Sequence, residues 1–95
     1  MARKFIFPGL LLAVLAGCAG APVQEMSDAR QALHSAERAG AARYSPRQFH
    51  EARRLLQEAE HKLTVSAYGE ARRLALDARD RAIQARETAS AQLVY

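Results

Sequence analysis

Residues 68–89 read YGEARRLALDARDRAIQARETA, and this stretch decides the fold because its alanines recur at helical spacing. Residues three or four apart lie on one face of an α-helix, so the alanines form a continuous stripe of small side chains. Such a stripe lets the backbones of neighbouring helices approach closely, which predicts a helix packed against other helices. The stripe, called here the alanine seam, consists of Ala71, Ala75, Ala78, Ala82, Ala85 and Ala89.

A short repeat places two similar stripes ahead of the alanine seam. Each copy begins with a large apolar residue, Met26, Phe49 or Tyr68, and continues two residues later with an acid followed by Ala-Arg. The chain has no tryptophan and is rich in Ala, Arg, Glu and Leu, a composition that favours helices over strands. We therefore predict an all-α fold of three antiparallel helices, over about residues 22–39, 46–65 and 67–92.

The start of the second helix carries the strongest boundary signal. Ser45 is the expected N-cap, Pro46 suits the first helical position, and Gln48 stands where it completes a capping box. Tyr44 and Phe49 lie at the spacing of a hydrophobic staple.

The other boundaries rest on fewer residues. Gly40 is expected to end the first helix in a left-handed conformation. A third helix begins near Ala67 if Ser66 caps it, but only Gly69 interrupts the pattern there, so one long helix over residues 46–92 is the alternative.

The first 17 residues have the architecture of a secretory signal peptide. Arg3 and Lys4 are followed by about a dozen mostly apolar residues, too few for the roughly 20 that a transmembrane helix needs. The sequence Leu15-Ala16-Gly17-Cys18 is similar to the lipobox of bacterial lipoproteins at all four positions. We therefore expect cleavage before Cys18 and attachment of diacylglyceryl and N-acyl groups to that residue. A conventional signal peptide cut near Gly20 is the alternative.

The expected mature protein is one small lipid-anchored domain. Residues 1–17 form the signal peptide, residues 18–21 a lipidated tether and residues 22–95 the helical domain. The mature part carries 12 basic and 10 acidic residues, a formal charge of +2. Ala19 follows Cys18 where an acid would retain a Gram-negative lipoprotein at the inner membrane, so we expect the periplasmic face of the outer membrane.

Few residues suggest chemistry beyond lipidation. His34, His50 and His61 are scattered, and Cys18 is the only cysteine, so we expect no metal site, no cofactor besides the acyl groups and no enzyme. Arginine doublets alternate with acids, as in the run Arg54-Glu58-Lys62 at i,i+4 spacing, which is typical of exposed helices rather than of nucleic-acid binding.

A second stripe on the third helix lies away from the alanine seam and mixes cations with apolar bulk. It is a candidate interaction face for an acidic partner helix or anionic lipid headgroups, and a second packing face within the bundle is the alternative. Because each buried alanine methyl contributes only about 0.8 kcal/mol, self-association or an envelope protein partner is expected to complete the core. The stripe, called here the arginine stripe, consists of Arg72, Leu76, Arg79, Ile83 and Arg86.

Three local patterns, together with the lipobox, resemble a known family. They are Tyr44-Ser45-Pro46, Glu51-Ala52-Arg53-Arg54-Leu55-Leu56 and Tyr68-Gly69-Glu70-Ala71-Arg72-Arg73-Leu74. They are similar to the lipoproteins that contain domain of unknown function 4398. That resemblance implies a short, tetratricopeptide-like helical unit of Gram-negative envelopes, with no known reaction and no catalytic residues.

The predicted function is that of a small helical protein-interaction or structural module, anchored in the outer membrane and facing the periplasm. The first alternative is a membrane-surface or envelope-spacing element that contacts anionic lipid through the arginine stripe. A cryptic enzyme is the least favoured alternative.

Overall fold

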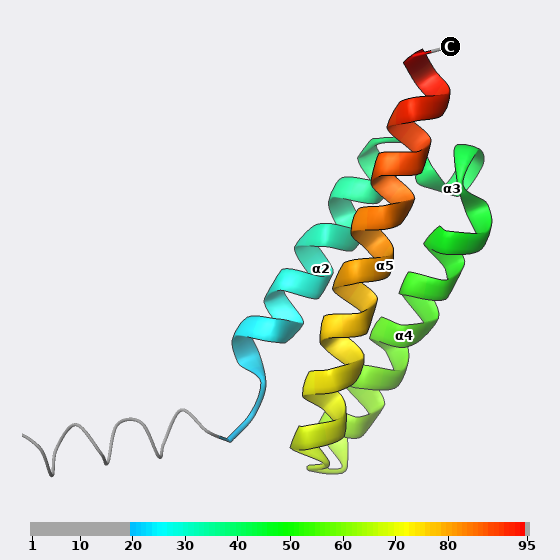
Figure 1. Cartoon of the computed structure of the whole chain (residues 1–95). Coiled ribbons are helices and arrows are strands. Elements are labelled where there is room, and N and C mark those ends of the chain that lie inside the picture. The colour runs from blue at the N-terminus through cyan, green and yellow to red at the C-terminus, as the bar shows by residue number, and fades with distance from the viewer. Residues whose placement is uncertain (1–19, 95) are drawn as a thin grey trace, which may run out of the picture.

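A computed structural model describes residues 20–94, with side chains through Gln92, as four helices joined by short turns (Figure 1). No strand occurs within these residues, so the predicted all-α class is confirmed. The predicted signal peptide, its motif Leu15-Ala16-Gly17 and the lipidation site Cys18 lie outside the described residues. The helices are α2 (Val23–Arg38), α3 (Ala41–Tyr44), α4 (Pro46–Thr64) and α5 (Tyr68–Val94).

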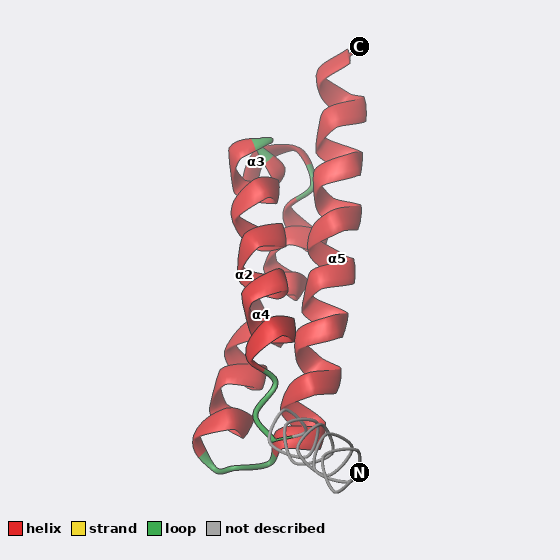
Figure 2. Cartoon of the chain, turned by 90° about the vertical axis from the view of Figure 1, so that its left-hand side faces the viewer, coloured by secondary structure: helices red, strands yellow, loops and turns green. Residues whose placement is uncertain are grey.

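The helices pack with α5 against both α2 and α4. Figure 1 shows α5 between the other two long helices, and the turned view of Figure 2 shows α2 and α4 on the same side of it. Helix α4 runs antiparallel to α2 and α5 (Figure 1). Between residues 20 and 94 the chain thus has one helix more than predicted, the single turn α3, which carries it from α2 across to α4.

The core consists of two clusters of buried residues. The leucine cluster lies nearer the α4–α5 turn, and the alanine cluster lies nearer α3. Every alanine of the seam is at most 2% exposed, so this face of α5 is covered by α2 and α4 as the spacing predicts. The leucine cluster contains Met26, Ala29, Leu55, Leu56, Ala59, Ala75 and Ala78. The alanine cluster contains Ala36, Ala41, Phe49, Ala52, Ala82, Ala85 and Ala89.

The turn after α2 depends on a glycine. Gly40 has φ +82° in the left-handed region, and its N–H donates to the carbonyl of Glu37 at 3.0 Å. A Cβ at this position would lie 3.2 Å from Cδ2 of Tyr44. The predicted left-handed end of the first helix is therefore present, and both backbone and space favour glycine there.

The turn after α4 separates the last two helices. Ser66 has φ +62°, its N–H donates to the Leu63 carbonyl at 3.1 Å, and the Ala67 N–H donates to the Lys62 carbonyl at 2.9 Å. This pair of bonds is a Schellman motif. The expectation that Ser66 caps the third helix is wrong, because its backbone instead ends α4.

Ser45 also behaves differently from its prediction. It precedes Pro46 at the start of α4, but its hydroxyl makes no capping bond. The Ser45 Oγ donates to the Ala85 carbonyl on α5 at 2.6 Å, while Oε1 of Gln48 is buried without a hydrogen-bond partner. The predicted capping box is therefore absent, because close packing of α5 offers the hydroxyl an acceptor on another helix.

Candidate interaction groove between α2 and α5

The arginine stripe lies on the side of α5 that faces α2. Arg72, Leu76, Arg79 and Ile83 are half-buried, and Arg86 is exposed. At the far end, Nη1 of Arg86 donates to Oγ of Ser35 on α2 at 3.4 Å. The stripe thus forms one wall of the space between two helices rather than a free helix face.

Arg72 has a structural role within this stripe. Its Nε lies 3.4 Å from Oε2 of Glu25 on α2, and its Nη2 donates to the Gly20 carbonyl at 3.1 Å. Both contacts join the start of α2 to the first turns of α5. Arg72 is therefore engaged inside the bundle.

The remaining basic residues of the stripe line an open groove of about 720 Å³ between α2 and α5. Four arginines and a single acid make the groove basic. Its apolar lining comes from Ile83 and Ala32. The full lining is Asp28, Arg30, Gln31, Ala32, His34, Ser35, Arg38, Arg79, Ile83 and Arg86.

Several charges of the groove already have partners. Arg30 contacts Glu60 of α4 at 3.3 Å, and Arg79 contacts Asp80 at 2.9 Å. The carboxylate of Asp28 accepts a hydrogen bond from Nε2 of Gln24 at 2.8 Å. The two ion pairs leave fewer cations available to a ligand.

Arg38 and Arg86 are the two groove arginines that form no ion pair with a described residue. Both side chains are exposed, and one comes from each wall of the groove. Guanidinium groups bind carboxylates and phosphates through paired, charge-assisted hydrogen bonds. This groove is therefore suited to an anionic partner with some apolar surface.

The side of α5 that faces α4 has the opposite character. A smaller groove of about 360 Å³ lies there, and it contains three acids and one arginine. Helix α5 thus separates a basic groove from an acidic one. The lining of this acidic groove is Glu51, Leu55, Asp77, Asp80, Arg81 and Gln84.

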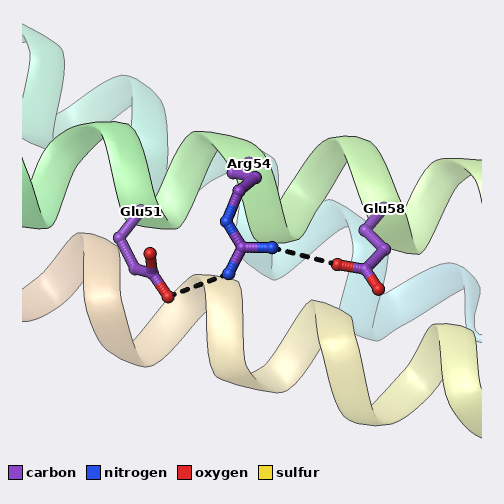
Figure 3. Close-up of polar contacts among 3 residues, drawn as sticks. All are labelled: Glu51, Arg54 and Glu58. Atoms are coloured by element: carbon purple, nitrogen blue, oxygen red, sulfur yellow. Dashed lines mark hydrogen bonds and ion pairs between the residues drawn. The ribbon is translucent and has the colours of Figure 1, made fainter.

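The predicted charge run on α4 forms only in part. Arg54 contacts Glu58 at 3.3 Å as expected, and it also contacts Glu51 at 3.0 Å (Figure 3). Lys62 pairs instead with Glu70 across the α4–α5 turn at 3.1 Å. All these side chains are substantially exposed, so the pairs contribute little to stability.

The histidines that the sequence shows are dispersed in space as well. His34, His50 and His61 are all exposed, and only His34 lies in the basic groove. Among residues 20–94, no group of three or more histidine, cysteine, aspartate or glutamate side chains is placed to hold a metal ion. None of the helices in that same range is long and apolar enough to cross a membrane.

Half of the groove was missed by sequence reasoning. The α2 wall includes Arg30, His34 and Arg38, which stand at i,i+4 spacing and therefore share one face of that helix. That spacing is a visible signal, but only the tertiary structure shows that this wall faces Ile83 and Arg86.

Comparisons with known proteins give one match. The family model described as Domain of unknown function (DUF4398) matches residues 24–93. The chain matches no curated protein and no solved structure.

Proposed function

The chain belongs to the DUF4398 family, and on that premise we propose that it is a lipid-anchored envelope protein whose basic groove binds an acidic partner segment. The partner would be another protein of the periplasm or of the inner face of the outer membrane. The chain would act by binding rather than by catalysis. Its helices would serve as a short tetratricopeptide-like unit that presents the groove.

The basic groove carries this proposal. It combines two arginines without an ion pair among residues 20–94, Arg38 and Arg86, with the apolar side chain of Ile83. An amphipathic acidic helix matches that lining, because carboxylates would meet the guanidinium groups while an apolar side chain covers Ile83. The groove lies between parallel helices, so an elongated segment fits it better than a small molecule.

The anchoring part of the proposal rests on Leu15-Ala16-Gly17-Cys18. Acyl chains on Cys18 would hold the domain at a membrane, since two or more chains bind far more stably than one. Ala19 supports placement in the outer membrane. The diacylglyceryl and N-acyl groups are the only non-protein groups that the proposal requires.

Cross-linking in intact cells tests the proposal. The variant Arg38→Glu with Arg86→Glu should lose the partner adduct, whereas the matched charge reversal Arg47→Glu with Arg53→Glu, exposed on α4, should retain it. Cys18→Ala should release the domain from the membrane. A partner adduct that persists at wild-type yield in the Arg38, Arg86 variant would contradict binding in the basic groove.

Self-association is a second candidate, favoured by the acidic groove on the other side of α5. One copy's basic groove and another copy's acidic groove have opposite charge, so the two grooves could meet in a contact between copies. In the cross-linking experiment, adducts of the chain only to itself would support this candidate. Their loss on Asp77→Lys with Asp80→Lys would identify the acidic groove as the second half of the contact.

Direct binding of anionic lipid by the arginine stripe has weaker support. Arg72 is engaged with Glu25 and Gly20, and Arg79 with Asp80, so most of the stripe is not free to meet headgroups. A lipid surface element should respond mainly to removal of Arg72, Arg79 and Arg86. An adaptor should instead lose its partner on Leu76→Asp or Ile83→Asp while it stays folded and anchored.

A further inference from the structure

One end of the bundle carries exposed large apolar side chains. Among residues 20–92 they are Val23, Val65 and Tyr68, which are 74%, 58% and 37% exposed. Val23 begins α2, Val65 follows the last turn of α4, and Tyr68 begins α5. Single exposed apolar residues are common on protein surfaces, but their collection at one end is a feature that needs a cause.

The same end holds the first described residue of the chain. Arg72 binds the Gly20 carbonyl at 3.1 Å and Glu25 at 3.4 Å, so residue 20 lies beside the first turns of α5. Figures 1 and 2 show the start of α2 and the α4–α5 turn at one end of the bundle, with α3 at the other. Gly20, Val65 and Tyr68 therefore belong to one end surface.

The proposed anchor is only two residues from Gly20. Two residues span at most about 7 Å even when fully extended. Acyl chains on Cys18 would therefore keep Gly20, and the end surface around it, close to the lipid headgroups.

The charges at this end are largely paired. Lys62 contacts Glu70 at 3.1 Å, and Arg72 contacts Glu25 at 3.4 Å. Arg73 is exposed and forms no ion pair among residues 20–92, so attraction to anionic lipid at this end depends mainly on that one cation. Two valines and a tyrosine instead suit the apolar and interfacial layers of a bilayer, where tyrosine is enriched in membrane proteins.

We propose that the end surface formed by Val23, Val65 and Tyr68 rests in the lipid interface of the membrane that holds the acyl chains. This inference depends on the proposed lipid anchor and adds an orientation to it. The three long helices then point away from the bilayer, and the basic groove faces the aqueous space along its whole length. Because α5 has 27 residues, its far end reaches about 40 Å from the membrane.

Depth-dependent quenching tests this orientation on the lipidated full chain. The chain is bound to vesicles of phosphatidylethanolamine and phosphatidylglycerol that contain nitroxide-labelled lipids. A fluorescent label is attached to one introduced cysteine, at Gly69→Cys in the end surface, Gln31→Cys in the basic groove or Ala42→Cys on α3. Gly69 suits a label because no atom lies within 4 Å of a Cβ built there.

The expected result is strong quenching at position 69 and roughly tenfold weaker quenching at positions 31 and 42, since those sites would stand clear of the lipid. Replacing phosphatidylglycerol by phosphatidylcholine should leave this pattern unchanged. Equal quenching at positions 31 and 69 would overturn the proposal, because the bundle would then lie on its basic groove.

A triple variant tests whether the apolar side chains cause the orientation. Val23→Ser, Val65→Ser and Tyr68→Ser together should abolish most of the quenching at position 69, while the chain still floats with the vesicles through its acyl groups. The matched variant His50→Ser, Gln57→Ser and Gln92→Ser, also at exposed positions, should retain it. Circular dichroism confirms that both variants are folded.

The two proposals fail in different ways. A chain that floats with vesicles but shows no quenching at position 69 overturns the orientation alone. Unchanged quenching in the apolar triple variant overturns the role of the end surface. A wild-type chain that does not float refutes the lipid anchor and, with it, the orientation that depends on it.

Discussion

The leucine cluster and the alanine cluster both join α2, α4 and α5, and the alanine cluster also includes Ala41 of α3, but the two clusters stabilise the bundle differently. The leucine cluster buries Met26, Leu55 and Leu56, whereas Phe49 is the only large side chain fully buried in the alanine cluster. Burial of large apolar surface is the main contribution in the first cluster. In the second, close backbone approach allows the Ser45 hydroxyl to reach the Ala85 carbonyl at 2.6 Å. The alanine cluster should therefore tolerate changes in side-chain size less well than the leucine cluster.

Loss of the single large side chain of the alanine cluster should have the largest effect. Phe49 is 4% exposed, and Phe49→Ala should lower the free energy of unfolding by about 3–5 kcal/mol, which is comparable with the whole stability of a domain this small. Leu56→Ala should cost less, because Leu55 and Met26 can move into the space. Urea unfolding followed by circular dichroism measures both. If Phe49→Ala lowered the free energy of unfolding by no more than Leu56→Ala does, the expected difference between the two clusters would be contradicted.

Replacing an alanine of the seam by a larger residue should have the second-largest effect on stability. Ala82 is completely buried, and Ala82→Leu should destabilise the fold by about 1–3 kcal/mol because α5 must move away from α2 and α4. Gln84→Leu, two residues along on the exposed face, is the control and should change the melting temperature little. A stable Ala82→Leu variant with an unchanged melting temperature would show that the helices are not closely packed.

Loss of the hydrogen bond between Ser45 and the Ala85 carbonyl should have a smaller effect on stability. Ser45→Ala removes the donor to the Ala85 carbonyl and should lower the free energy of unfolding by about 1 kcal/mol. Thr64→Ala is the matched control, because the Thr64 hydroxyl donates to the His61 carbonyl at an exposed site. The shift of the urea midpoint should be clearly larger for Ser45→Ala. Equal shifts would mean that the bond adds nothing to the alanine cluster.

The two turns that close the clusters should respond in opposite directions. Ser66 adopts a left-handed backbone conformation beside the leucine cluster, so Ser66→Gly should raise stability by up to about 1 kcal/mol. Gly40→Ala, beside the alanine cluster, should lower it by about 1 kcal/mol or more, since the added Cβ meets the Tyr44 ring. Thermal melting of the two variants gives both signs. A stabilising Gly40→Ala would contradict the left-handed geometry of that turn.

Local signals predicted the features that depend on neighbouring residues in the chain. The left-handed Gly40, Pro46 at the start of α4 and the burial of the alanine seam all follow from backbone preferences and helical spacing. Only one wall of the candidate groove was predicted. The arginine stripe on α5 was recognised, but the opposite wall on α2 was not. The break at Ser66 was one of two alternatives, since no residue there forbids a continuous helix.

The wrong prediction at Ser45 has a definite cause. A serine before a proline and three residues ahead of a glutamine matches a capping box. The hydroxyl instead donates to the Ala41 carbonyl at 3.4 Å and, over a shorter distance, to an acceptor on α5. That acceptor, the Ala85 carbonyl, is 40 residues away and becomes available only when α5 packs against α4. A similar limit applies to the short α3, which lies in a segment without apolar periodicity.

The sequence by itself determined that this chain forms helices, where most of them begin and end, and which face of the last one is buried, because these properties depend on contacts within a few residues. The tertiary structure decided which helices share a groove and which arginines have no ion pair among the described residues. It also decided at which end of the bundle Val23, Val65 and Tyr68 lie exposed. Those properties depend on contacts such as Arg86 with Ser35, 51 residues apart, which helical periodicity does not specify.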